Sequence, residues 1–212
     1  MLRIWGRTSS SNVKKVLWCA DELELPFERI DAGGAFGVVD TPEYRALNPN
    51  GLVPTIDDDG LILWESNVIV RYLWSQYLWS QYLWSQYGRS LNPAEQARAE
   101  RWMDWTLGTF IPGFAPIFVN LVRTPADQRD HAAMAAGLAR AGAALAIADG
   151  ELRRQPFFSG KQLGVGDFAL GAVIHAWYEM PIERPDLQYL RAWYDRLLGR
   201  PGYRKHIAVP LA

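Results

Sequence analysis

Two short stretches carry residue types that could bind a small anionic molecule. In the first, Val53-Pro54 opens a short apolar run, and in the second, Glu65-Ser66 stands at the start of a helical pattern. Proline cannot donate to a strand ladder, and a cis Val53-Pro54 bond would turn the Val53 N–H and C=O groups outward, free for a ligand. The first N–H groups of a helix beginning at Ser66, its plausible N-cap, would attract an anion. An edge-strand proline beside an ordinary capped helix explains the same spacing about equally well.

A loop of hydroxyl side chains precedes the first predicted helix. Thr8 to Ser11 follow an expected strand at residues 2–5, and Val13, Val16 and Leu17 then recur at helical spacing. A hydroxyl at this junction can cap the helix, or it can stabilise a nearby thiolate together with the helix dipole. On the pattern of this loop alone, simple capping is the better interpretation.

The two stretches together resemble a known family, the soluble glutathione transferases. Gly-Leu-Val-Pro-Thr-Ile, followed by Leu-Trp-Glu-Ser-Asn-Val-Ile-Val-Arg-Tyr-Leu, is similar to the family's glutathione-binding segment, and Leu25-Pro26-Phe27-Glu28 also resembles it. The similarity is to bacterial serine-type (theta- or nu-like) members. It implies an α/β thioredoxin-like N-terminal domain at residues 1–87 and an all-α C-terminal domain at 92–212.

The resemblance also implies how glutathione binds. Val53 would bond the cysteinyl backbone of glutathione across cis-Pro54, while Glu65 and Ser66 would hold the γ-glutamyl end. Many members carry Lys where this chain has Leu52. Because that Lys helps to bind the glycyl carboxylate, the third anchor is in question here.

The thiol-activating group is implied in the same way. In serine-type members a hydroxyl at the loop-to-helix junction donates to the glutathione sulfur, and counting back from the 25–28 segment assigns that role to Ser10. Ser9 and Ser11 remain alternatives by a one-residue slip. Asn12 matches an asparagine that some bacterial members use beside the thiolate. Asp104 matches an acid that in some members reaches the glutathione amino group, often across the dimer.

The implied activity is glutathione transfer. The activated thiolate would attack a small-molecule electrophile, a detoxification chemistry, in a cytoplasmic homodimer with glutathione as co-substrate. The asparagine match makes glutathione-dependent disulfide or peroxide reduction a second enzymatic hypothesis. A non-catalytic glutathione-fold binding protein is the third hypothesis, and both Leu52 and the repeat at residues 72–86 favour it.

Composition narrows these classes further. The 212 residues carry a formal net charge of −1 and 49% hydrophobic residues, which gives no reason to expect nucleic acid as a partner. Cys19, the single cysteine, is expected in the core, and three separated histidines make a metal site unsupported. No apolar run approaches the ~20 residues that span a bilayer, so we expect no membrane partner.

Residues 72–86 are three tandem copies of Tyr-Leu-Trp-Ser-Gln, closed by Tyr87. Relative to the family, two copies look like an insertion. A five-residue period places successive copies about 140° apart around a helix, so no single apolar face persists. A helix continuing from Asn67 to Tyr87 is the favoured conformation, with one copy looping out as the alternative.

The remaining elements are expected to position these residues. The order over the first 70 residues is β-α-β-α-β-β-α, with a tight hairpin at Asp59-Gly60. In the helical half, Asp167 is expected to return a hydrogen bond to the helix start at Gly164, a folding role. His175 is expected to be packed. Phe110, Phe114 and Phe118 either line an apolar pocket or pack.

Overall fold

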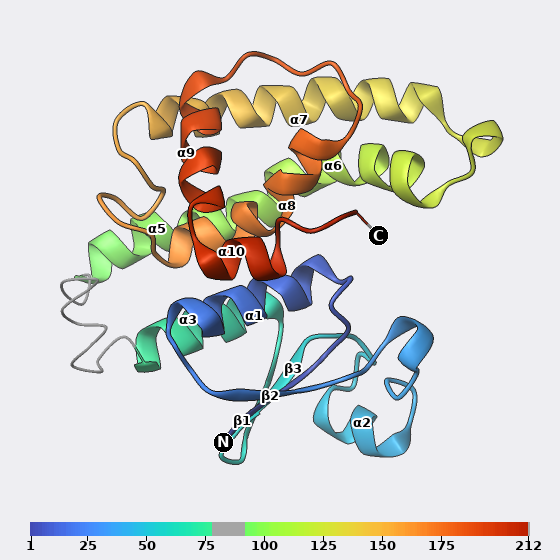
Figure 1. Cartoon of the computed structure of the whole chain (residues 1–212), viewed down its shortest axis with the longest axis vertical. Helices are drawn as coiled ribbons and strands as arrows, with labels where there is room; N and C mark the ends of the chain where they lie inside the picture. The colour runs from blue at the N-terminus through green and yellow to red at the C-terminus, as the bar shows by residue number, and fades with distance from the viewer. Residues whose placement is uncertain (78–91, 212) are drawn as a thin grey trace. The chain divides into compact units, whose positions relative to one another are not determined.

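The computed structural model describes residues 1–77 and 92–211 of the chain. Among these residues the chain forms two compact units, one of residues 1–77 with 202–207 and the other of residues 92–201 with 208–211 (Figure 1). The first is a small mixed sheet with helices and the second is helical, which confirms the predicted fold class.

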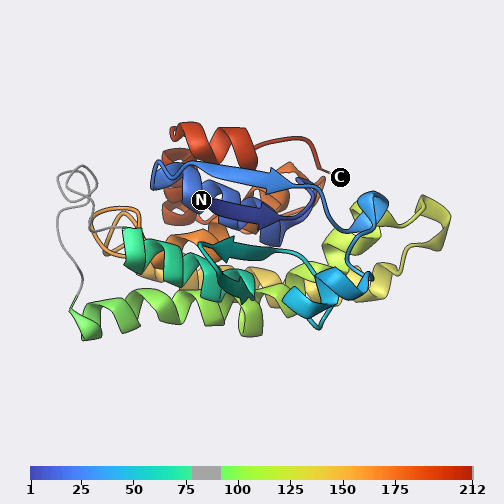
Figure 2. The same ribbon diagram turned by 90° about the horizontal axis from the view of Figure 1, so that it is seen from below.

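The first unit follows the predicted order of elements. Its strands and helices are β1 (Leu2–Trp5), α1 (Ser11–Glu22), β2 (Phe27–Ile30), α2 (Pro42–Leu47), β3 (Thr55–Asp58), β4 (Leu61–Trp64), α3 (Ser66–Tyr77) and α10 (Pro201–His206), with a 3-10 turn at Gly34–Phe36. The sheet order is β2-β1-β3-β4, with β1 parallel to β2 and antiparallel to β3. Helices α1 and α3 lie side by side, and α2 lies apart from both (Figures 1 and 2).

The hairpin between β3 and β4 is confirmed. Asp59 and Gly60 have φ angles of 50° and 97°, which match a two-residue turn with positive φ at both positions. The Gly60 N–H donates to Asp57 Oδ1 at 2.7 Å, so the carboxylate closes the turn. The strand register pairs Thr55, the first residue of β3, with Trp64, the last residue of β4. Only Glu65 separates Trp64 from the start of α3.

Helix α10 packs in the first unit although it comes last in the chain. Its Tyr203 ring meets the Trp18 ring of α1 edge-on, with centroids 4.9 Å apart. Lys205 Nζ and His206 Nε2 both lie 2.8 Å from Asp21 Oδ2. Cys19, which lies on α1 between Trp18 and Asp21, is fully buried, as predicted. Burial raises the pKa of its thiol well above the usual value.

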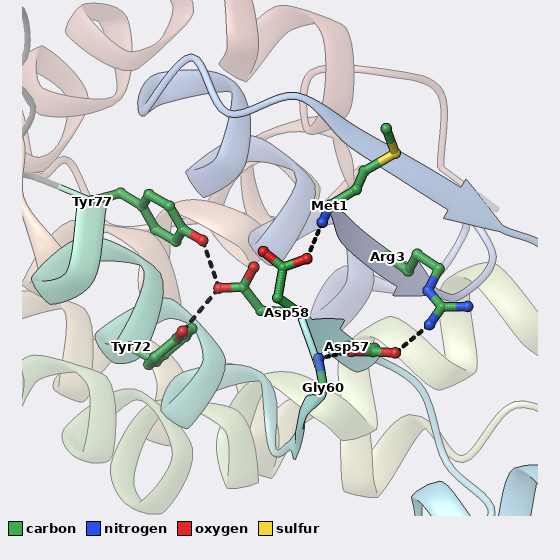
Figure 3. Close-up of polar contacts among 8 residues, drawn as sticks. Met1, Arg3, Asp57, Asp58, Gly60, Tyr72 and Tyr77 are labelled. Atoms are coloured by element: carbon green, nitrogen blue, oxygen red, sulfur yellow. Dashed lines mark hydrogen bonds and ion pairs between the residues drawn. The ribbon is translucent and has the colours of Figure 1, made fainter.

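The described part of the repeat is bonded to the hairpin. The hydroxyls of Tyr72 and Tyr77, five residues apart on α3, both donate to Asp58 Oδ2, at 2.8 and 2.6 Å (Figure 3). Long phenol side chains thus reach one carboxylate from positions about 140° apart on the helix. Residues 78–91 lie outside the described part, so the expected continuation of the helix to Tyr87 stays a prediction, as does the interpretation of the repeat as an insertion.

The second unit consists of helices joined by short turns. Its elements are α5 (Pro93–Trp105), a π-helical turn (Thr106–Phe110), α6 (Ile111–Phe118), a second π-helical turn (Val119–Arg123), a 3-10 turn (Ala126–Gln128), α7 (His131–Leu152), a 3-10 turn (Val165–Asp167), α8 (Phe168–Glu179) and α9 (Gln188–Leu198). Helices α6 and α7 run against each other (Figure 1), and a Cβ on Gly113 would come within 2.7 Å of the Ala141 nitrogen. Glycine is therefore required at that crossing.

Two predictions about the second unit are confirmed. Asp167 is fully buried, and its Oδ2 accepts from the Gly164 N–H at 3.1 Å, as expected of a residue with a folding role. His175 is 9% exposed, with Nδ1 2.7 Å from the Tyr194 hydroxyl. Phe110 and Phe114 are buried and stacked on each other, so these two rings pack in the core.

Two helical stretches of the second unit could cross a membrane by length and composition. They are Pro93–Arg123 and His131–Leu152, with mean hydropathies of 1.4 and 1.3 over their most apolar windows. Neither stretch contains the single apolar run of ~20 residues that the sequence prediction concerned, so the expectation of no membrane partner stays a prediction. Core helices of soluble proteins pass the same test, so this is weak evidence for a membrane span.

Candidate functional site

The backbone at Val53 is held from beneath by a buried polar network. The Val53-Pro54 bond is cis, as predicted, and both residues precede the first ladder pair of β3. The carbonyl of Leu52 accepts from the Tyr44 hydroxyl at 2.7 Å and from Asn48 Nδ2 at 2.9 Å. These two side chains also lie within hydrogen-bond distance of the Thr55 hydroxyl, at 2.8 and 3.1 Å. The network fixes the chain on both sides of Val53.

Helix α3 begins one residue earlier than a Ser66 N-cap requires, so the predicted N-cap role of Ser66 was wrong. Ser66 is the first helical residue, and the first helical hydrogen bond runs from the Ile69 N–H to the Glu65 carbonyl at 2.9 Å. The Ser66 hydroxyl therefore has another use, and it donates to Asn12 Oδ1 at 3.2 Å. Glu65 is exposed and has a φ of 69°, a left-handed conformation that is costly for a non-glycine residue. This strain at an exposed carboxylate points to a function.

The start of α1 presents the serine loop. Ser10 occupies the N-cap position of α1, yet its side chain makes no capping hydrogen bond. Ser9 Oγ accepts from the Arg7 guanidinium at 3.0 Å, and Ser11 is the exposed first residue of the helix. Capping does not use the Ser10 hydroxyl, which disagrees with the simple capping interpretation.

The structure brings Asn12 and Ser66 together from separate helices. Because Asn12 Oδ1 accepts from Ser66, the Nδ2 group is the end of this exposed side chain that can donate to a bound sulfur. The serine loop and the start of α3 are thereby tied to each other. Asp104 lies on an exposed face of α5 in the second unit, and its position relative to these residues is not defined.

Sequence reasoning missed one buried cation close to this pair. Lys15 is 2% exposed, and its Nζ donates to Asn67 Oδ1 at 2.5 Å. Burial lowers the pKa of Lys15 to about 7, with Glu65 acting to raise it and Arg71 to lower it. The apolar residues Val13, Val16 and Leu17 predict the buried face of α1, and Lys15 is not part of that pattern. Its burial therefore could not be predicted from the sequence.

A second cation lies next to the loop that packs on Val53. Gly34 has a φ of 60°, and a Cβ there would come within 2.9 Å of the Arg7 side chain. A Cβ on the preceding Gly33 would lie 3.4 Å from the Val53 side chain. Arg7 and Val53 therefore flank the same pair of glycines. Leu52, in contrast, is 65% exposed and offers no charge.

No group of three or more metal-ligating side chains occurs within residues 1–77 and 92–211. The expectation that no metal takes part is not tested by this and stays a prediction.

The fold and these residues define a class of protein. Residues 9–76 match the family described as "Glutathione S-transferase, N-terminal domain", and residues 131–196 match "Glutathione S-transferase, C-terminal domain". The chain belongs to the glutathione S-transferase family, as the resemblance of its motifs predicted.

Similar proteins place it more closely. The chain is 43% identical over 214 residues to "Glutathione S-transferase GstB" of Escherichia coli K12, with all of both proteins covered. It matches the crystal structure of the theta class glutathione S-transferase of Xanthomonas axonopodis pv. citri with glutathione bound, at a TM-score of 0.91 and 51% identity, covering 100% of this chain and 99% of that one. A maize protein named "Glutathione S-transferase 3" is 27% identical over 99% of this chain and 95% of its own length. The similarity to a bacterial theta class member confirms the subgroup that the sequence indicated.

Proposed function

We propose that this chain, a glutathione S-transferase, activates the glutathione thiol with Ser10 and Asn12. Val53, beside cis-Pro54, would bond the cysteinyl backbone, while Glu65 and Ser66 would hold the γ-glutamyl end. The observation that carries the proposal is the Ser66–Asn12 hydrogen bond of 3.2 Å, which joins the carboxylate-binding helix start to the serine loop. Family membership supplies the ligand class.

The chemistry follows from hydrogen bonding to sulfur. An O–H donor from Ser10 and an N–H donor from Asn12 stabilise the thiolate relative to the thiol, so the bound thiol loses its proton to solvent at lower pH. The sulfur lone pair then forms a bond to the electrophilic carbon. In a substitution the leaving group departs with its bonding pair, and in an addition the displaced pair takes up a proton from water.

Kinetics of single serine variants test the assignment of Ser10. Ser10→Ala should lower kcat/KM roughly 10- to 100-fold, since one hydrogen bond to a charged group contributes about 1.5–3 kcal/mol. Ser9→Ala and Ser11→Ala are the matched controls and should stay within about twofold of the parent. A large loss in Ser9→Ala or Ser11→Ala, with Ser10→Ala active, would move the role to that neighbour.

Arg7 is the cation we assign to the glycyl carboxylate, in place of the missing lysine at position 52. Its side chain lies against Gly34, and Val53 lies against Gly33, so the cation is next to the part of the site that binds the cysteinyl unit. Arg7→Ala should weaken glutathione binding about tenfold and leave binding of glutathione ethyl ester, which lacks the glycyl charge, nearly unchanged. Equal losses for both ligands would contradict the assignment.

Two other functions are distinguished by simple assays. Glutathione-dependent disulfide or peroxide reduction is favoured by Asn12, whose exposed amide can act beside a thiolate. It would show as turnover of a disulfide with little conjugation of a chlorinated aromatic. A non-catalytic glutathione-binding protein would bind glutathione and turn over neither substrate.

The assembly and surroundings are proposed from the family. We propose a soluble, cytoplasmic homodimer that conjugates small electrophiles in detoxification, without a metal ion or a nucleic-acid or membrane partner. Asp104 would contact the glutathione amino group. Sedimentation analysis tests the dimer, and Asp104→Asn tests the contact through an increase in KM at constant kcat. An unchanged KM would remove Asp104 from the site.

A further inference from the structure

Helices α1 and α3 are joined by two side-chain hydrogen bonds at the proposed site. Asn12 and Lys15, three residues apart and thus on one side of α1, bond the successive residues Ser66 and Asn67 of α3, at 3.2 and 2.5 Å. The outer bond reaches the surface, since Asn12 is exposed. The inner one is buried, because Lys15 is 2% and Asn67 5% exposed.

Lys15 is an unusual choice for the inner position. A buried ammonium is normally paired with a carboxylate, because removing a charge from water is costly. Here the hydrogen-bond partner is a neutral amide. The charged groups that face Lys15 are Glu65, which precedes α3, and Arg71 in α3, and they act in opposite directions. The positive end of the α3 dipole repels the Lys15 ammonium, as Arg71 does.

We propose that Lys15 is a positioning residue that takes up a proton when the γ-glutamyl carboxylate of glutathione binds at the start of α3. This inference rests on the proposed glutathione site. The ligand carboxylate would bring a negative charge beside the first turn of α3, whose second residue bonds Lys15. In so dry a position, that charge strongly favours the ammonium form.

The sign of the effect follows from linkage. Burial lowers the pKa of Lys15 to about 7 in the free protein, so the amine is mostly neutral at pH 8. An anion raises that pKa, and a proton is bound together with the ligand. By reciprocity, the affinity for the carboxylate is highest below pH 7 and falls as the pH rises through the pKa of the free protein.

The experiment must separate this proton from the thiol proton that the transferase mechanism releases. S-methylglutathione keeps both carboxylates and has no ionisable thiol. Its binding is measured by calorimetry at pH 8 in phosphate, HEPES and Tris, whose ionisation enthalpies differ, so the slope of the observed enthalpy counts protons. The wild-type protein should take up more than about half a proton per ligand.

Three variants give the contrast. Lys15→Met should bind S-methylglutathione with almost no proton uptake and a nearly flat pH dependence, and Lys15→Arg should also bind without uptake because arginine stays charged. Asn67→Asp places a carboxylate on Lys15, so the amine is already protonated and uptake should fall by at least about half. Should Lys15→Met fail to fold, Asn67→Asp and the wild-type protein still supply the comparison.

Two results would overturn the inference. Equal proton uptake by the wild-type protein and by Lys15→Met or Asn67→Asp shows that the proton goes elsewhere, and the inference fails alone. If neither glutathione nor S-methylglutathione binds the wild-type protein at millimolar concentration, the proposed function fails and this inference fails with it.

Discussion

The two units bury ionisable side chains in opposite ways. Asp167 in the helical unit accepts hydrogen bonds from four groups, which are the N–H groups of Phe158, Ser159 and Gly164 and the indole of Trp193. Lys15 in the sheet unit donates to a single neutral amide. Burial raises the pKa of Asp167 to about 6 while its donors act to lower it, and burial lowers the pKa of Lys15 to about 7.

The contrast shows how to distinguish a folding residue from a binding residue. A buried charge whose hydrogen-bonding capacity is filled has nothing left for a ligand, and it ties segments of the fold together. A buried charge with a weak partner leaves favourable interactions to be gained when an anion arrives. We therefore assign Asp167 to folding and Lys15 to the site.

The largest effect is expected at Asp167. Replacing it by alanine leaves three buried donors and one partly buried donor without an acceptor, which should cost about 3–5 kcal/mol of unfolding free energy. Chemical denaturation checks this, with Trp193→Phe as the control that removes one donor and costs about 1 kcal/mol. Similar stabilities for Asp167→Ala and Trp193→Phe would show that the network does not hold the helices.

In contrast to Asp167→Ala, Lys15→Met should stabilise the protein at low pH. Below pH 7 the wild-type protein keeps a charge in a dry site, so the variant should be about 2 kcal/mol more stable, allowing for the lost bond to Asn67. As pH rises from about 7 towards 10.5, the folded protein binds fewer protons than the unfolded chain, so the wild-type protein gains stability relative to the variant. Denaturation at pH 6 and pH 9 measures the difference, and a pH-independent difference would contradict the account.

Glu65 separates backbone strain from ligand binding. Glu65→Gly relieves the left-handed φ of 69°, so unfolding free energy should stay the same or rise by up to ~1 kcal/mol, while glutathione affinity falls about tenfold. Glu65→Gln keeps the strain and removes the charge, so it should lose affinity without a gain in stability. If Glu65→Gly binds glutathione as well as the parent, the carboxylate is not part of the site.

The smallest effect is expected at the repeat. Tyr77→Phe removes one of two hydroxyls that share Asp58, and should cost about 0.5–1 kcal/mol because Tyr72 still satisfies the carboxylate. Burial, together with hydrogen bonding to Asp58, raises the pKa of both tyrosines, to about 12 for Tyr72. The double variant should cost more than the sum of the single ones, and simple additivity in thermal denaturation would show that the two bonds are independent.

Local signals in the sequence predicted much of the fold. Asp59-Gly60 specified the hairpin through its φ preferences, and Asp167 after Gly164 specified a helix start. Val53-Pro54 together with Glu65-Ser66 indicated the family. In each case, the residues that carry the signal lie in one short stretch of the chain, which for the family signal runs from Val53 to Ser66.

What escaped prediction depends on partners that are distant in the chain. The buried Lys15 donates its hydrogen bond to Asn67, 52 positions away, and the Ser66 hydroxyl donates to Asn12, 54 positions away. The packing of Tyr203 on Trp18 likewise joins the last helix to the first. Periodicity describes one helix at a time, so it cannot show which faces meet.

The most direct test of the account is the thiol pKa of bound glutathione, followed by thiolate absorbance in the wild-type protein and in Ser10→Ala. We expect the wild-type complex to titrate at least about one pH unit below free glutathione, and Ser10→Ala to return the value most of the way to that of the free thiol. A thiol that titrates identically in both proteins would contradict the assignment of Ser10 as the activating group.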